Sequence, residues 1–209
     1  MQLTLPRSSN GLKLLCWSLA AHVILSASGA EVAGKEALLA ARGKAITQEA
    51  FQLLSSNLKQ ALLRGGVSEA LPYCSLQAGP LTRQVAKTND VVLRRVSHNP
   101  RNPKNRADEV EAALLKRFLN DLSEGHPPQP VVVWGDSGQA VYFAPIILNN
   151  PLCLKCHGQP GTDIGPADLA TIRELYPQDK ATGFKLGELR GMWRVDFKPA
   201  TRPEPEASQ

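Results

Sequence analysis

Five consecutive residues, Cys153-Leu154-Lys155-Cys156-His157, carry the clearest chemistry in this sequence. They form the pattern C-x-x-C-H, in which two cysteine thiols become thioethers to the vinyl groups of a haem and the next histidine binds the iron. The two intervening residues set the separation of the thiols to that of the vinyl groups. We therefore predict one covalent haem c, attached through Cys153 and Cys156, with His157 as an axial ligand of the iron.

Two other kinds of site use closely spaced cysteines. A thioredoxin-like C-x-x-C begins a helix after a strand in a βαβ pattern, and this sequence has no such pattern. A zinc site needs a fourth nitrogen or sulfur ligand, which more commonly comes from a second C-x-x-C. The export signal at the start of the chain favours haem, because haem c is attached outside the bacterial cytoplasm.

The first thirty residues have the three parts of an export signal. Arg7 and Lys13 supply positive charge, residues 14–25 form a short apolar run, and Ser28-Gly29-Ala30 offers small residues for cleavage. The apolar run is shorter than the ~20 residues of a membrane-spanning helix. We predict a signal peptide at residues 1–30 and a periplasmic protein without a membrane span after its removal; retention by an uncleaved signal is the alternative.

Composition limits the remaining function classes. Removal of the signal leaves 179 of the 209 residues and lowers the formal charge from +5 to +3, because the signal carries two basic residues and no acidic ones. That length suits one domain with its own core. The charge is too small, and too little interleaved with aromatic residues, to indicate a nucleic-acid partner.

Hydrophobic periodicity predicts helices first and strands afterwards. An α+β domain with an antiparallel sheet is the architecture that such an order favours, and we place it at residues 31–198. The Pro/Glu-rich residues 199–209 are predicted to be a disordered tail. The expected elements are helices over 31–64 (ended by Gly65-Gly66), from 68 onward, 108–122 and 166–176, and strands over 91–96, 131–134, 139–147 and 188–197.

Cysteine counting gives a candidate for the second axial ligand. Cys16 lies in the signal, so the mature chain keeps Cys74 beside the two haem cysteines, and a leftover thiol in an oxidising compartment needs an explanation. Cys74 also lies on a helical stripe with Leu71 and Ala78, so it should point inward. An ordinary buried cysteine is the alternative, because free cysteine is among the most buried residue types.

Three further residues could take the same axial position. His98 lies beside a turn-rich loop and His126 in a Gly-His-Pro-Pro break, where solvated histidines are usual. Met192 would give a Met/His cytochrome. It alternates with Arg190 and Arg194 on the last strand, however, and we expect it on the surface.

Arginines near the first strand are candidates for the haem propionates, although exposed surface arginines are the simpler expectation. They are Arg94, Arg95, Arg101 and Arg106.

Several motifs in this order resemble the Tll-type c-type haem domain family. They are Tyr73-Cys74-Ser75-Leu76, residues 101–105, residues 151–158, and residues 176–184 with 187–191. The resemblance covers roughly Lys35 to Lys198. It implies a PAS-like fold in which a haem is ligated by a histidine, here His157, and by a cysteine thiolate, here Cys74.

Ligation by a thiolate and a histidine restricts function. A thiolate donates electron density and favours ferric iron, and two occupied axial positions leave no site for substrate, so we do not expect an enzyme. The resemblance implies a redox or small-ligand sensor module, since such domains also serve as input domains of signalling proteins. A periplasmic electron-transfer cytochrome is the alternative. Either role needs a separate redox or signalling partner protein, and the sensor also needs a small gas ligand or an electron.

Overall fold

The computed structural model describes residues 16–135 and 137–198. It divides into Met1–Leu38 and Leu39–Gln209. In the first unit, residues 16–38 are helical and form the start of α1 (Cys16–Thr88). The beginning of the predicted signal and the predicted disordered tail lie outside the described residues. Across the two described ranges, no helix contains an apolar stretch long enough to cross a membrane.

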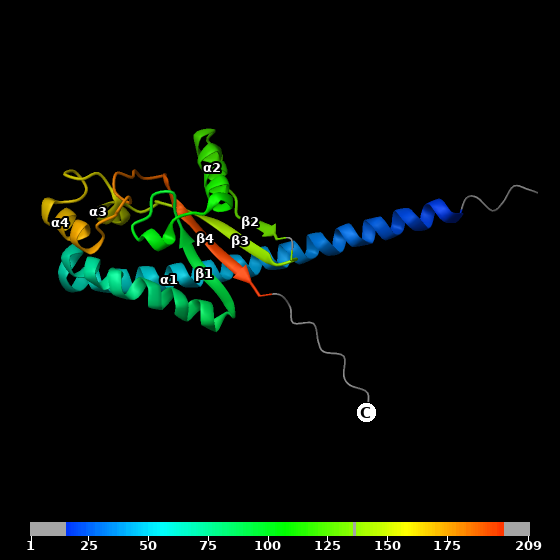
Figure 1. Cartoon of the computed structure of the whole chain (residues 1–209), viewed down its shortest axis with the longest axis horizontal. Coiled ribbons are helices and arrows are strands. Elements are labelled where there is room, and N and C mark those ends of the chain that lie inside the picture. The colour runs from blue at the N-terminus through cyan, green and yellow to red at the C-terminus, as the bar shows by residue number, and fades with distance from the viewer. Residues whose placement is uncertain (1–15, 136, 199–209) are drawn as a thin grey trace, which may run out of the picture. The chain divides into compact units, whose positions relative to one another are not determined.

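A break at Gly65 and Gly66 divides α1 into a first segment (39–64 within the second unit) and a second segment (67–88). Gly66 has φ +66° and ψ −154°, a conformation open to glycine and strained for other residues. The second segment runs back along the first (Figure 1), and the Tyr73 hydroxyl donates to Asn57 Oδ1 at 2.9 Å between them. The predicted helix stop at the paired glycines is therefore confirmed.

Four antiparallel strands form one sheet in the order β1-β4-β3-β2. The strands are β1 (Val91–Val96), β2 (Val131–Trp134), β3 (Ala140–Ile147) and β4 (Leu189–Phe197). A register irregularity between Ile146 and Ile147 interrupts the pairing of β3 with β4. The predicted α+β class with an antiparallel sheet is confirmed.

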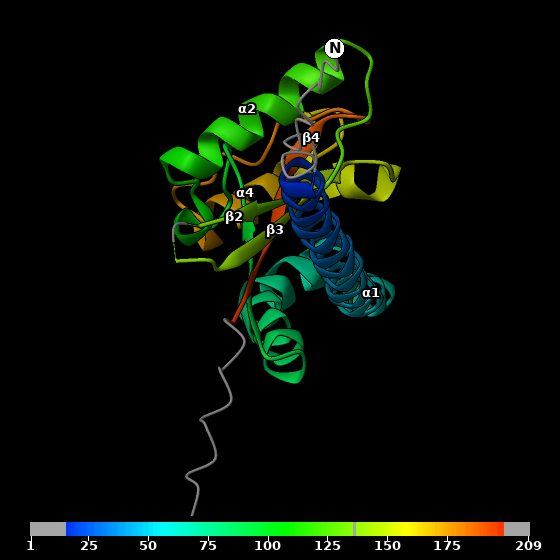
Figure 2. The same cartoon turned by 90° about the vertical axis from the view of Figure 1, so that its right-hand side faces the viewer.

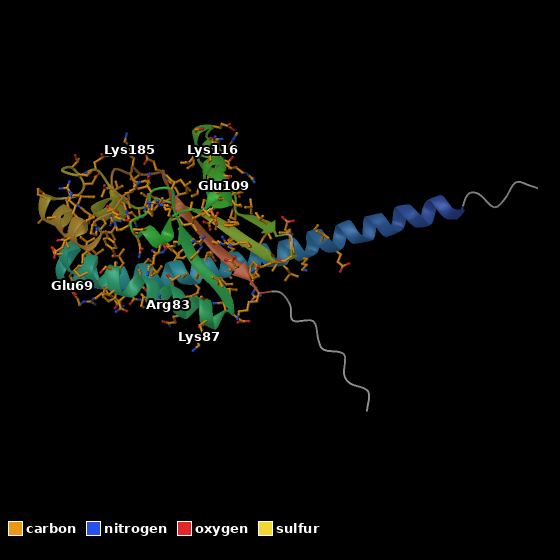
Figure 3. The ribbon with its side chains drawn as sticks, in the orientation of Figure 1. Glu69, Arg83, Lys87, Glu109, Lys116 and Lys185 are labelled. Atoms are coloured by element: carbon orange, nitrogen blue, oxygen red, sulfur yellow. The ribbon has the colours of Figure 1, made fainter. Side chains whose placement is uncertain are left out.

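Helices cover both faces of this sheet (Figures 1 and 2). On one face, Ile46 and Ala50 of α1 pack against Trp193 and Val195 of β4. On the other, Leu115 and Phe118 belong to α2 (Glu109–Ser123), whose amphipathic stripe closes a second apolar cluster. Figure 3 shows Glu109 and Lys116 on α2 across the sheet from Arg83 and Lys87 on the second segment of α1.

The surface position predicted for Met192 is wrong. Its side chain is 0% exposed and packs with Leu115, Phe118 and Val96 beneath α2. The alternation of β4 assigned Met192 to the correct face, but α2 covers that face. Met192 is therefore a core residue.

Short elements complete the chain between β3 and β4. They are the 3-10 turn η2 (Pro151–Cys153), α3 (Leu154–His157) and α4 (Pro166–Leu175); a further turn, η1 (Pro103–Asn105), follows β1. The Asn150 side chain accepts from the Leu152 amide at 2.9 Å and so initiates the turn that presents Cys153. The C-x-x-C-H motif thus begins at the last residue of the 3-10 turn and continues through the single turn of α3.

Candidate functional site

A cavity of about 610 Å³ lies between the two segments of α1, one end of the β1–β4 pair and the C-x-x-C-H turn. This volume is within the range of ligand and cofactor sites in proteins. The four residues predicted from the sequence all line it: Cys74, Cys153, Cys156 and His157. Residues separated by about eighty positions in the sequence therefore meet on one cavity.

The walls of the cavity are mainly apolar. Leu54, Leu58 and Leu62 recur at helical spacing on the first segment of α1, and Trp193 closes the sheet end. On the second segment, Leu71 is buried beside Cys156 in a small cluster. Because Leu71 and Cys74 are three residues apart on one helix, they face the cavity together. The inward direction predicted for Cys74 agrees with this placement.

The ring of His157 has a defined orientation and tautomer. Its Nδ1 lies 2.8 Å from the carbonyl oxygen of Ala181. A carbonyl oxygen only accepts, so Nδ1 carries the proton and the lone pair of a neutral ring lies on Nε2. Burial, together with the charges of Arg190 and Arg101, lowers the pKa of His157 well below its usual 6.5. His157 is consequently a neutral imidazole at pH 7, the form that binds a metal.

Arg101 links the C-x-x-C-H turn to the loop around Ala181, whose carbonyl oxygen orients the ring of His157. Its Nη2 donates to the carbonyl oxygen of Cys156 at 2.6 Å and to that of Ala181 at 3.3 Å, and its Nε donates to Asp179 Oδ1 at 3.0 Å. The side chains of this ion pair are only 12% and 7% exposed. Arg101 is therefore a nearly buried structural arginine, and the surface position expected for it is wrong.

Burial favours the neutral form of two of the cavity thiols, Cys74 and Cys156. Burial raises the pKa of Cys74, although the positive charges of Arg95 and Arg101 oppose this effect. Burial also raises the pKa of Cys156 to about 11. Cys74, Cys153 and Cys156 all lack a disulfide partner among the described residues. Each thiol is thus available for covalent or metal chemistry.

The other three candidates for the second axial position do not line this cavity. Met192 lies beneath α2 on the opposite face of the sheet. His126 is exposed, with Nδ1 3.6 Å from Glu124 Oε2. His98 lines a neighbouring hollow, separated from His157 by the ring of Phe184, which both histidines contact edge-on. Of the four candidates, only Cys74 shares a cavity with His157.

The guanidinium groups of Arg95 and Arg190 also line the cavity. Arg95 was among the sequence candidates, although a surface position was the simpler expectation; Arg190 was missed, and both line the cavity. The alternation of β1 contained a signal for Arg95, because Val91 and Leu93 share its face and pack into the core. Arg94, on the opposite face, instead binds the buried carboxylate of Glu111. Arg106 is exposed.

The cavity has few protein ligands for a bare metal ion. No cluster of three or more histidine, cysteine, aspartate or glutamate side chains suited to a metal is found among the described residues. A haem differs in this respect, because its porphyrin supplies four ligands and the protein supplies only the axial ones.

Comparisons with known proteins give a fold and a family. A search of curated proteins finds no match. Among solved structures, the crystal structure of the cyanobacterial heme-protein Tll0287 matches with a TM-score of 0.55 and 23% sequence identity, over 82% of this chain and 98% of that one. This likeness supports the fold. The Tll0287-like family model matches residues 28–197. The chain therefore belongs to the Tll0287-like family, in agreement with the resemblance found in the sequence.

Proposed function

We propose that this protein binds one haem c in the cavity and acts as a redox or small-ligand sensor module outside the cytoplasm. Cys153 and Cys156 would form the thioethers, and His157 and Cys74 would be the axial ligands. The observation that carries the proposal is that the C-x-x-C-H turn and Cys74 line the same cavity. The relative that matches in structure is described as a heme-protein.

The residues fit a haem in three respects. The cavity walls are apolar, as a porphyrin face requires. His157 presents Nε2 because Ala181 holds Nδ1. Cys74 is a half-buried thiol without a disulfide. When bound, the haem would supply a one-electron couple whose ferric form a thiolate ligand favours.

The two axial residues are held unequally, and this difference favours a sensor over a simple electron carrier. The Ala181 carbonyl fixes His157, and Arg101 fixes Ala181 in turn. Within the described part of the chain, the Cys74 thiol forms no hydrogen bond, and burial raises its pKa. A Cys74 released from the metal would therefore tend to take up a proton, because burial outweighs the charges of Arg95 and Arg101 that favour the thiolate. Cys74 could therefore dissociate when the haem iron is reduced or oxidised. The axial position that it leaves would then be open to a small molecule.

Neither axial position offers a place for substrate while both ligands are bound, so the proposed function is not catalytic. Signal output would require a separate partner protein. The signal peptide predicted at residues 1–30 supports a periplasmic location for this protein, and the proposed partner would then act in the same compartment.

The first test is whether haem is covalent. Full-length protein exported by a host with haem c maturation should retain its haem after acid-acetone extraction, and Cys153→Ser with Cys156→Ser should abolish this retention. Extraction of all haem from the wild-type protein contradicts the proposal.

The second test concerns Cys74. Cys74→Ser should convert the ferric spectrum from low-spin and thiolate-ligated to high-spin or water-ligated. Met192→Leu and His126→Gln are matched controls that should leave the spectrum unchanged. An unchanged spectrum in Cys74→Ser would assign the axial position to another residue. Redox titration with and without carbon monoxide then measures whether the position opens on reduction, and a site that stays closed in both states favours electron transfer.

A further inference from the structure

The charged residues in the otherwise mainly apolar lining of the cavity are all basic. Its lining includes no carboxylate among the described residues but six basic side chains: Arg83, Arg95, Arg101, Lys104, Lys155 and Arg190. Charged groups removed from water need a partner of opposite sign. The composition of the lining therefore calls for an anionic occupant.

Four of these six cations already have water or a carboxylate around them. Arg83, Lys104 and Lys155 are exposed to solvent. Arg101 pairs with Asp179. The remaining two, Arg95 and Arg190, are only partly exposed and form no ion pair with any described carboxylate.

Neutral contacts hold these two guanidinium groups in place. Arg95 lies over the ring of Trp193 at 5.9 Å. Arg190 lies over Phe184 at 5.4 Å, and its Nη1 donates to Ser97 Oγ at 2.8 Å and to the carbonyl oxygen of Asn99 at 3.1 Å. A guanidinium has five N–H donors in a planar fork, so each arginine keeps donors for a further acceptor.

Burial away from water disfavours the charged form of both guanidinium groups. Burial, together with the charges of Arg101 and Arg95, lowers the pKa of Arg190 to about 10. Burial also lowers the pKa of Arg95. A ligand with two carboxylates would relieve both effects. A planar fork matches a carboxylate with two parallel hydrogen bonds.

We propose that Arg95 and Arg190 bind the two propionate carboxylates of the haem. This assignment rests on the proposed haem function. It identifies the residues that orient the porphyrin within the cavity, in addition to the thioethers and axial ligands.

The test compares a porphyrin that has carboxylates with one that lacks them. Full-length chain carrying Cys153→Ser and Cys156→Ser is titrated with ferric haem b and with its dimethyl ester, so that binding is non-covalent and measurable. Each carboxylate–guanidinium contact should favour the free acid by about 10- to 100-fold. Arg95→Gln and Arg190→Gln should each reduce this preference, and the double variant should abolish it. Lys116→Gln is the control, since it removes one positive charge from the exposed side of α2, across the sheet from the cavity (Figure 3).

Equal preference for the free acid in the wild-type and double-arginine backgrounds overturns the proposal, as does the absence of any preference in the wild-type background. The covalent haem content of exported Arg95→Gln and Arg190→Gln variants with intact cysteines is measured as well. It distinguishes a failure of the propionate assignment from a failure of the proposed haem function. If the serine background binds neither porphyrin, a crystal structure of the haem-loaded wild-type chain decides. Propionate oxygens within about 3.2 Å of both guanidinium groups support the proposal, and propionates directed into solvent refute it.

Discussion

Replacing Arg101 by methionine should destabilise the protein strongly, because Arg101 is the tie between the C-x-x-C-H turn and the loop around Ala181. The change keeps a side chain of similar length but removes every donor. It leaves the Asp179 carboxylate, 7% exposed, without its countercharge. It also removes the hydrogen bond to the Cys156 carbonyl oxygen, 2.6 Å long in the wild type.

The expected cost follows from the burial of the pair. Removing one partner of a buried ion pair costs about 3–5 kcal/mol, because the remaining charge is left uncompensated. We expect the Arg101→Met variant to lose that much free energy of unfolding. The double variant Arg101→Met with Asp179→Leu should recover a large part of the loss, since neither charge then remains buried.

The assay is urea unfolding of the wild-type protein and the variants, followed by circular dichroism. Arg106→Met is the matched control: it also removes an arginine, but an exposed one near η1, and should change stability by no more than about 0.5 kcal/mol. A loss below about 1 kcal/mol in Arg101→Met, or strictly additive losses in the double variant, would refute the reasoning.

Three further predictions test the core, the backbone and the acidity of the site. Met192→Ala should lower the free energy of unfolding by about 2–5 kcal/mol while leaving the haem spectrum unchanged, as measured by denaturation and absorbance; a surface-like loss would contradict the burial of Met192. Gly191→Ala should disrupt the β1–β4 pairing, because its Cβ would lie 2.3 Å from the Val96 carbonyl oxygen at φ +154°, and wild-type thermal stability in this variant would count against the described strand geometry. Burial lowers the pKa of His157 in the folded haem-free chain below its unfolded value of 6.5. The unfolded chain therefore binds more protons in acid than the folded chain does. The free energy of unfolding present above pH 6.5 should consequently fall as the pH drops below 6.5. His157→Gln should lessen that fall in urea midpoints measured between pH 7.5 and 5, and an identical fall in both proteins would exclude His157 as the cause.

The sequence predicted those features that depend on local pattern. The C-x-x-C-H spacing is local, and the stripe through Leu71 and Cys74 follows from helical periodicity alone. The helix end at the glycine pair could also be predicted from the sequence, because glycine readily adopts a positive φ such as that of Gly66.

The features that the sequence missed depend on what covers a face or on distant contacts. Strand alternation separates two faces of β4 but does not say that α2 covers the face of Met192. The tie made by Arg101 joins residues 55 to 80 positions apart in the chain. The position of Arg190 in the cavity likewise depends on the fold at the irregularity between β3 and β4. Local propensity contains none of this information.

The fold divides the proposed axial ligands between two differently anchored elements, and this division has consequences for how the site responds. His157 belongs to a network that includes Ala181, Arg101 and Asp179, so loosening it means breaking a buried ion pair. Cys74 belongs to the second segment of α1, which a glycine break separates from the first, and its thiol has no hydrogen-bond partner among the described residues. Changes around His157 should therefore appear mainly as lost stability, and changes at Cys74 mainly as altered spectra and potential. A bond that can break without unfolding its surroundings is the one suited to a switch, and in this fold that would be the proposed bond to Cys74.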